Sequence, residues 1–183
     1  MITVYVELVP ADTVKYELDK ESGLLRVDRP QRYSNVSPEP YGFVPRSLCG
    51  PRVAKLAARA TRRRLLLGDH DPLDVCVLTG HNLGHGGVLV EARPVGGLRL
   101  LDGREVDDKI LAVLERDPTY AHCRELEDCP EALVDRIEHY FLTYKDMPGA
   151  VTKRIELVGR YGAEEAREVI AASIADYAES HRG

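Results

Sequence analysis

The stretch Asp69-His70-Asp71-Pro72-Leu73-Asp74 places three carboxylates within six residues. The apolar and β-branched run that follows, Val75-Cys76-Val77-Leu78-Thr79, predicts a buried strand. If that strand begins at Asp74, its carboxylate stands at the mouth of the strand, while Pro72 stiffens the turn that carries the other two acids. Ionised acids this close repel one another unless cations or hydrogen bonds compensate. Because hard oxygen ligands suit Mg²⁺ or Mn²⁺ rather than zinc, the stretch predicts a divalent-metal site, with an unliganded acidic surface turn as the alternative.

A second acidic cluster stands in the same relation to an apolar strand. Asp102-Gly103-Arg104-Glu105-Val106-Asp107-Asp108-Lys109 leads directly into Ile110-Leu111-Ala112-Val113-Leu114. Acids at the edge of a second buried strand support the metal-site interpretation. His81 and His85 have helical ligand spacing, but the glycines around them predict a flexible loop and not a metal site.

Length and composition predict one compact domain over residues 1–183. The chain is 44% hydrophobic and 30% charged, which is enough for a sizeable core. A net charge of −5 argues against a general nucleic-acid binder. No apolar run is long enough to span a membrane and the first residues lack a signal-peptide pattern, so we expect a cytoplasmic protein. The four cysteines are scattered without paired spacing, which predicts reduced thiols.

Alternating and periodic patterns predict the elements that must position these acids. We expect strands at 2–9, 15–19 and 24–29, the last two forming a hairpin, and an irregular connection at 30–45, which contains four prolines. Further strands are expected at 88–93 and 97–101, joined around Pro94-Val95-Gly96, and at 154–158. A helix capped by Asp128 should run to about Tyr144, and a last helix should span 163–180.

The segment at about 51–67 is unusually basic. Residues 51–64 carry six positive charges and no acid. Alanine and leucine favour a helix there, but the apolar residues do not define a clean stripe. The segment could contact nucleic acid or another subunit; we favour a solvated surface insertion because aromatic residues are absent.

Taken together, the motifs resemble those of the family I soluble inorganic pyrophosphatases. The resemblance runs from about Val4 to Tyr177, with the basic segment at 51–67 as its main insertion. Its most specific part is the Asp-x-Asp-Pro-x-Asp-Val turn at 69–75. The other parts, in chain order, are Glu7, Lys15-Tyr16-Glu17, Asp28-Arg29, Tyr41-Gly42, Arg93-Pro94-Val95-Gly96, Asp102 with Asp107 and Lys109, and Tyr144-Lys145-Asp146.

The resemblance implies a fold, a reaction and a role for each matching residue. The fold would be α+β, mainly β: an OB-like five-stranded closed barrel with flanking helices. The reaction would be Mg²⁺-dependent hydrolysis of pyrophosphate to two phosphates, with several Mg²⁺ ions in each site and Mn²⁺ as a possible substitute. Asp71 would be the general base. The metal ligands would be Asp69, Asp74 and Asp107 for the activating ions, Glu7, Asp102 and again Asp107 for an ion that arrives with substrate, and Glu17 through water. The phosphate ligands would be Lys15, Arg29, Tyr41, Lys109, Tyr144 and Lys145.

Two departures from the family pattern carry expectations of their own. Bacterial members commonly have Tyr-Pro-x-Asn-Tyr-Gly where this chain has Ser37-Pro38-Glu39-Pro40-Tyr41-Gly42. A serine cannot reach as far as a phenol, so we expect a working but slower enzyme. Bacterial hexamers often present two histidines four residues apart at a subunit contact, and here only His139 is present, with Thr143 at the other position. A homo-oligomer is therefore expected, without a commitment to a hexamer.

Two other functions fit part of the pattern. One is a phosphatase of related fold that acts on a larger phosphoanhydride. The other is a non-enzymatic OB-like module that binds nucleic acid or protein through the basic insertion. The full set of acids favours an enzyme, because a binding module would gain nothing from so many mutually repelling carboxylates.

Overall fold

A computed structural model describes residues 1–32, 34–145 and 155–182 of the chain. Asp146 of the resemblance and Arg154 of the predicted strand at 154–158 lie outside the described residues. Within the described residues, no helix has both the length and the apolar character that crossing a bilayer requires. All four cysteines are buried free thiols, as their scattered spacing predicted.

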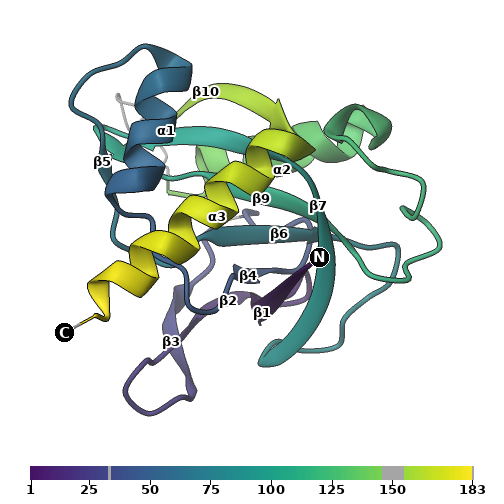
Figure 1. Ribbon diagram of the computed structural model, residues 1–183. Helices are drawn as coiled ribbons and strands as arrows, with labels where there is room; N and C mark the ends of the chain where they lie inside the picture. Colours follow the sequence, from purple (N-terminus) through teal and green to yellow (C-terminus); the bar gives the residue numbers. More distant parts are fainter. Residues whose placement is uncertain (33, 146–154, 183) are drawn as a thin grey trace.

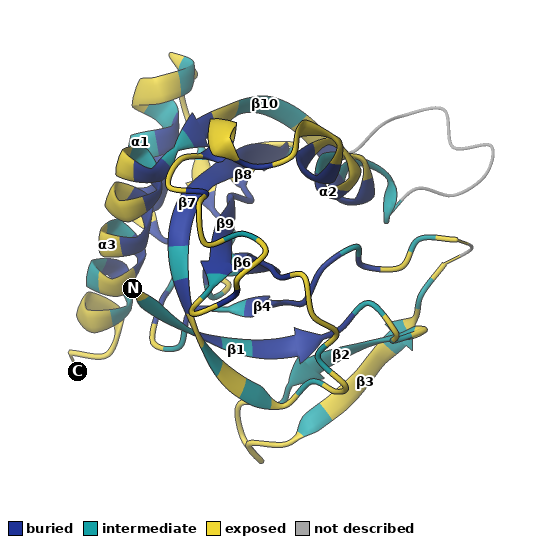
Figure 2. Ribbon diagram, turned by 90° about the vertical axis from the view of Figure 1, so that its right-hand side faces the viewer, coloured by how far each residue is buried: buried dark blue, intermediate teal, exposed yellow. Residues whose placement is uncertain are grey.

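Five strands form a closed ring (Figure 2). Their order is β1-β4-β6-β9-β7, and β7 pairs back with β1. All neighbours are antiparallel except β6 and β9, which are parallel. This ring confirms the predicted mainly β, OB-like class. The strands are β1 (Ile2–Leu8), β4 (Tyr41–Phe43), β6 (Asp74–Leu78), β7 (Val88–Asp102) and β9 (Lys109–Leu114).

The strand β7 corrects the prediction of two separate strands at 88–93 and 97–101. It is continuous over 15 residues, and its register with β9 shifts between Pro94 and Gly96. Proline cannot donate a hydrogen bond to the neighbouring strand, and a bulge accommodates it without ending the strand. The first part of β7 pairs with β1, and the second part pairs with both β9 and β10 (Ile155–Gly162).

The predicted irregular connection at 30–45 contains the short strand β4. A Cβ atom on Gly42 would overlap the backbone carbonyl of Tyr5, so glycine is what allows β4 to approach β1 this closely. The flanking prolines concealed this strand, and the prediction of an entirely irregular segment was wrong. The pairing of β4 with β6 brings Phe43 opposite Asp74.

Smaller strands complete the framework. The predicted hairpin is present as β2 (Val14–Leu18) and β3 (Leu25–Pro30), which form a two-stranded sheet of their own. Its turn is closed by Gly23, which has φ +71° and donates its N–H to the carbonyl of Asp19 at 2.8 Å. The strands β5 (Leu67–Gly68) and β8 (Glu105–Val106) pair in parallel, and β8 also pairs with β7.

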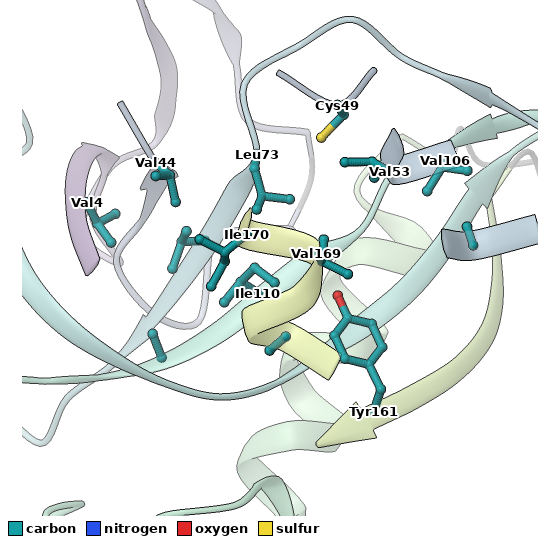
Figure 3. Packing of buried hydrophobic residues seen from close by; sticks show 14 of the residues in the cluster. Val4, Val44, Cys49, Val53, Leu73, Val106, Ile110, Tyr161, Val169 and Ile170 are labelled. Atoms are coloured by element: carbon teal, nitrogen blue, oxygen red, sulfur yellow. The ribbon is translucent and has the colours of Figure 1, made fainter. Parts of the chain in front are cut away.

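Two helices lie side by side on one face of the ring (Figure 1). They are α1 (Pro51–Thr61) and α3 (Ala163–Ser180). The apolar layer beneath them joins Val53 and Ala57 of α1 to Ile110 of β9 and Val169 of α3 (Figure 3). The interpretation of the basic segment as a solvated insertion was therefore wrong for this face of α1, although its basic side chains remain on the outside.

The helix α2 (Glu131–Thr143) packs with a second apolar cluster that includes Leu111 of β9 and Ile137 of α2. Asp128 does not cap this helix as predicted. It belongs to the preceding 3₁₀ turn (Leu126–Asp128), where its carboxylate accepts the N–H groups of Arg124 and Glu125 at 2.8 and 2.9 Å. Pro130 occupies the N-cap position of α2.

Candidate active site

One cavity of about 410 Å³ gathers the side chains that the sequence singled out from seven separate stretches of chain. Every residue assigned above to proton, metal or phosphate binding lines it, and their individual roles remain predictions. They are Glu7, Lys15, Glu17, Arg29, Tyr41, Asp69, Asp71, Asp74, Asp102, Asp107, Lys109, Tyr144 and Lys145.

The acidic turn has a defined backbone geometry. His70 has φ +63°, in the left-handed region, and the Oδ1 atom of Asp69 accepts the N–H of Asp71 at 2.9 Å. Two backbone hydrogen bonds to Cys49 anchor the turn, one from the N–H of His70 and one to the carbonyl of Asp71. The turn thus presents Asp69 and Asp71 beside Asp74, which begins β6 as predicted.

The ammonium group of Lys109 lies between two carboxylates at the centre of the site. It donates to Oδ2 of Asp74 and to Oδ1 of Asp107, and the Lys109 side chain is only 2% exposed. Asp107 and Lys109 face the same side because they are two residues apart in an extended segment. Burial alone would lower the pKa of Lys109, but the charges of Asp107 and Asp74 raise it well above its ordinary value. Lys109 is therefore a permanent cation.

The balance between burial and the charge of Lys109 shifts the pKa values of its two partners, Asp74 and Asp107, in opposite directions. Burial raises the pKa of Asp74 above its ordinary value, although Lys109 opposes this shift. For Asp107, burial is outweighed by Lys109 and by the more distant Lys145 and Lys15, so the pKa is lowered. Of the two partners of Lys109, Asp107 consequently stays ionised more readily than Asp74.

Other cations of the cavity are also paired with acids. Lys145 Nζ lies 3.2 Å from Oδ2 of Asp102. Lys15 donates to Glu17 and lies 3.7 Å from Oδ2 of Asp28, which in turn pairs with Arg29. The site thus alternates positive and negative groups, each able to exchange its present partner for a ligand of opposite charge.

Glu7 and Asp69, which both line the cavity, have pKa values raised close to neutral pH. Burial raises the pKa of Glu7 to about 7, with Asp74 adding to the shift and the N–H of Leu18, 2.6 Å from Oε1, opposing it. Burial likewise raises the pKa of Asp69 to about 7, with Asp107 adding to it. A cation that bound either group would therefore compete with a proton around neutral pH.

Two charged residues that line the cavity had no predicted role. Lys20 lies in the turn after β2, and Glu105 lies in β8. Glu105 could have been found, because it is two residues before Asp107 in an extended segment. Lys20 could not have been found from the sequence, because only the path of the turn after β2 brings it to the cavity.

The donor chemistry of the site fits hard divalent cations. The lining acids offer oxygen ligands, and the position between Asp74 and Asp107 already holds the positive charge of Lys109. Among the described residues, no three histidine, cysteine or acidic side chains form a ready-made cage for an ion.

A family model described as "Inorganic pyrophosphatase" matches residues 4–178, nearly the whole chain. This chain belongs to the inorganic pyrophosphatase family. The match confirms the resemblance drawn from the motifs and does not favour the non-enzymatic binding module.

Individual relatives agree with the family assignment. An "Inorganic pyrophosphatase" of Chlamydia trachomatis serovar L2 is 48% identical over 177 residues, which cover 94% of this pyrophosphatase and 85% of that protein. A "Soluble inorganic pyrophosphatase" of Zea mays is 35% identical over 179 residues, covering 98% and 73% of the two chains. The crystal structure of the Thermus thermophilus inorganic pyrophosphatase matches with a TM-score of 0.78 at 30% identity, covering 96% and 90%. A Helicobacter pylori inorganic pyrophosphatase structure matches with the same TM-score at 33% identity, covering 96% and 92%.

Proposed function

We propose that this pyrophosphatase hydrolyses inorganic pyrophosphate to two phosphates in the cavity described above, with Mg²⁺ held by its carboxylates. The observation that carries the proposal is the convergence of eight acids with five cations and two tyrosines on one cavity in a chain of this family. Acids alone would suit only the metal, and cations alone would suit only the phosphates. The combination suits a metal-bound polyanion.

The residues fit Mg²⁺, with Mn²⁺ as a substitute, because their donors are carboxylate oxygens. Asp69, Asp74 and Asp107 would hold the activating ions, and Glu7, Asp102 and Asp107 would hold an ion that accompanies substrate, with Glu17 acting through water. When bound, these ions neutralise phosphoryl oxygens and lower the pKa of a water nucleophile. Without such an ion, water is too weak an acid to supply enough hydroxide for attack on pyrophosphate at neutral pH.

Asp71 is the proposed general base. Its side chain lies on an exposed turn at the edge of the cavity, where water can reach it, and its N–H is held by Asp69. A carboxylate in this place can accept the proton that attacking water must lose.

The phosphoryl oxygens would be bound by Lys15, Arg29, Lys109 and Lys145, with the hydroxyl groups of Tyr41 and Tyr144 as donors. On substrate binding each cation would move from its carboxylate partner to a phosphate oxygen, leaving that carboxylate to a metal ion. The cations would then stabilise the charge that develops on the leaving phosphate.

The replacement at Ser37 supports a slower enzyme than members with a tyrosine there. Ser37 is buried and donates its hydroxyl to the carbonyl of Glu39 at 2.7 Å. Among the described residues, the side chains that line the cavity do not include it. We further propose a homo-oligomer in the cytoplasm, with Thr143 in place of the second histidine leaving the number of subunits open.

A metal-dependent phosphate-release assay tests the function. Wild-type protein with Mg²⁺ should release phosphate from pyrophosphate much faster than from nucleoside triphosphates, and D74N should lose nearly all of this activity. Equal rates on both substrates would favour a broader phosphoanhydride phosphatase. No release from either would reject the proposed function.

A further inference from the structure

A buried ion pair lies on the opposite side of the β9 segment from the active site. Asp108 stands between Asp107 and Lys109, so in an extended chain its side chain points away from the cavity that these two residues line. On that other side, Arg99 of β7 donates Nη2 to Oδ2 of Asp108 at 2.9 Å and Nε to Oδ1 at 3.3 Å. The two side chains are 4% and 0% exposed.

Two further elements hold this pair in place. The hydroxyl of Tyr161 in β10 donates to Oδ2 of Asp108 at 3.3 Å, and the Tyr161 ring lies 4.8 Å from the guanidinium carbon of Arg99. Glu165 of α3 accepts Nη1 of Arg99 at 2.7 Å. Tyr161 points into the apolar layer under α3 (Figure 3). A Cβ atom on Gly97 would overlap the ring of Tyr161, so the glycine in β7 leaves the space that this arrangement needs.

Stability alone does not account for charges in this layer. Tyr161, which contacts both members of the pair, belongs to a buried apolar cluster that includes Ile110 and Val169. Removing two charges from water costs several kcal/mol per ion, and well-packed apolar replacements of a buried pair are often neutral or stabilising. A buried, bidentate pair does, however, fix the relative position of the two strands that carry it.

The strand contacts show where this pair lies relative to Asp107 and Lys109. Asp107 donates its N–H to the carbonyl of Leu100 at 3.0 Å, and Lys109 pairs in register with Leu98. Arg99 therefore lies on β7 between the two positions that hold Asp107 and Lys109. A slip of one residue between β7 and this segment would turn both side chains out of the cavity.

We propose that Arg99 and Asp108 are positioning residues, which hold Asp107 and Lys109 in the orientation required to bind metal and phosphate. They act through the backbone of the Asp107–Lys109 segment and do not touch the substrate. The inference rests on the proposed function, because that function supplies the metal and the phosphate that Asp107 and Lys109 would bind.

The test is the double variant R99M/D108L, which replaces the pair with apolar side chains. The expected result is a protein that folds, with kcat lowered about ten- to a hundredfold. The Mg²⁺ concentrations for half-maximal activity and for half-maximal binding in titration calorimetry should both be raised by a similar factor. The matched control is R52M/D176L, which removes another pair with a buried acid, Asp176, between α1 and α3. That control should lower Tm but leave kcat and the Mg²⁺ requirement unchanged at 25 °C.

The outcomes separate the two proposals. Pyrophosphate hydrolysis by wild type together with unchanged kcat and Mg²⁺ requirement in folded R99M/D108L would overturn the positioning role and leave the function intact. Absence of hydrolysis by wild type would reject the function itself. If R99M/D108L does not fold, R99K decides, because lysine keeps the charge and loses the two-pronged contact. A raised Mg²⁺ requirement in R99K supports the role, and wild-type behaviour overturns it.

Discussion

Charged side chains in this site are paired with residues of opposite charge. Lys109 is shared by Asp74 and Asp107, and Lys145 is held by Asp102. Under the proposed function, a divalent ion would compete with the lysine for the acid, and a phosphate would compete with the acid for the lysine. Binding of a metal and binding of substrate should therefore favour one another, because each releases the group that the other requires.

The first prediction concerns Asp74. We expect D74N to lose at least about a hundredfold in pyrophosphate hydrolysis, because an amide is a much poorer Mg²⁺ ligand than a carboxylate. Burial raises the pKa of Asp74, so its ionised form costs stability, and the neutral amide should leave Tm without Mg²⁺ equal or higher at pH 8. Phosphate release and thermal unfolding of the same preparation measure both effects. Wild-type turnover in the variant would contradict the assignment.

The second prediction concerns Asp71. Loss of a general base typically lowers the rate by about a hundred- to ten-thousandfold, and we expect D71N to lower kcat in this range. The Mg²⁺ requirement should change little, because Asp71 is not among the proposed metal ligands. E91Q is the matched control, since Glu91 is exposed and accepts the Thr3 hydroxyl away from the cavity. If D71N raised the Mg²⁺ requirement without lowering kcat, Asp71 would be a metal ligand and not the base.

Strands and helices with a regular apolar pattern could be predicted from the sequence. Elements that depend on close packing against distant strands could not. The strands β6 and β9 follow from their apolar runs. Asp74 at the start of β6 and Asp107 just before β9 line the cavity, as expected for acids at the strand edges. The three-residue strand β4 has no pattern of its own, because it exists only through pairing with β1 and β6. The buried face of α1 is made of Val53, Ala54 and Ala57, and the apolar residues alone did not reveal it. The separation of this face from the exposed basic residues of the helix could have done so.

The third prediction tests the close approach at Gly42. We expect G42A to destabilise the protein by about 3 kcal/mol or more, lowering Tm by about 10 °C, because its Cβ atom would overlap the Tyr5 carbonyl. G159A is the control: a Cβ atom on Gly159, in β10, meets no atom within 4 Å. Thermal and urea unfolding of both variants measure the difference. A G42A protein as stable as G159A would show that β1 and β4 can separate without cost.

Across the whole molecule, the cavity depends on long-range folding that the sequence could indicate only through motifs. The acids of the turn at 69–74 and of the segment at 102–107 were recognisable as two local clusters. Their meeting with Glu7 and Lys15 depends on the closed ring, which brings distant parts of the chain together. The position of Lys109 between Asp74 and Asp107 could not be predicted, because it follows from the parallel pairing of β6 with β9.

The fourth prediction concerns the pH dependence of the whole protein. In the absence of metal, burial and neighbouring acids raise the pKa of Glu7 and Asp69 to about 7. Their folded pKa values exceed the unfolded ones, so the folded state binds protons more tightly. The stability that these protons contribute is present in acid and is lost as pH rises through about 7. In the proposed ligand set Mg²⁺ would bind the deprotonated forms of both acids, so it should raise Tm more at pH 8 than at pH 6, by about 3 °C or more.

Thermal unfolding with EDTA and with millimolar Mg²⁺, at both pH values, measures this difference. NaCl at matched ionic strength serves as the control, because simple screening would raise Tm without any specific site. The variant E7Q/D69N lacks the carboxyl groups of Glu7 and Asp69. Its Tm in EDTA should therefore change less between pH 6 and pH 8 than that of wild type. An equal Mg²⁺-induced rise in Tm at the two pH values would mean that metal binding does not displace protons from Glu7 and Asp69, and would remove these two acids from the proposed ligand set.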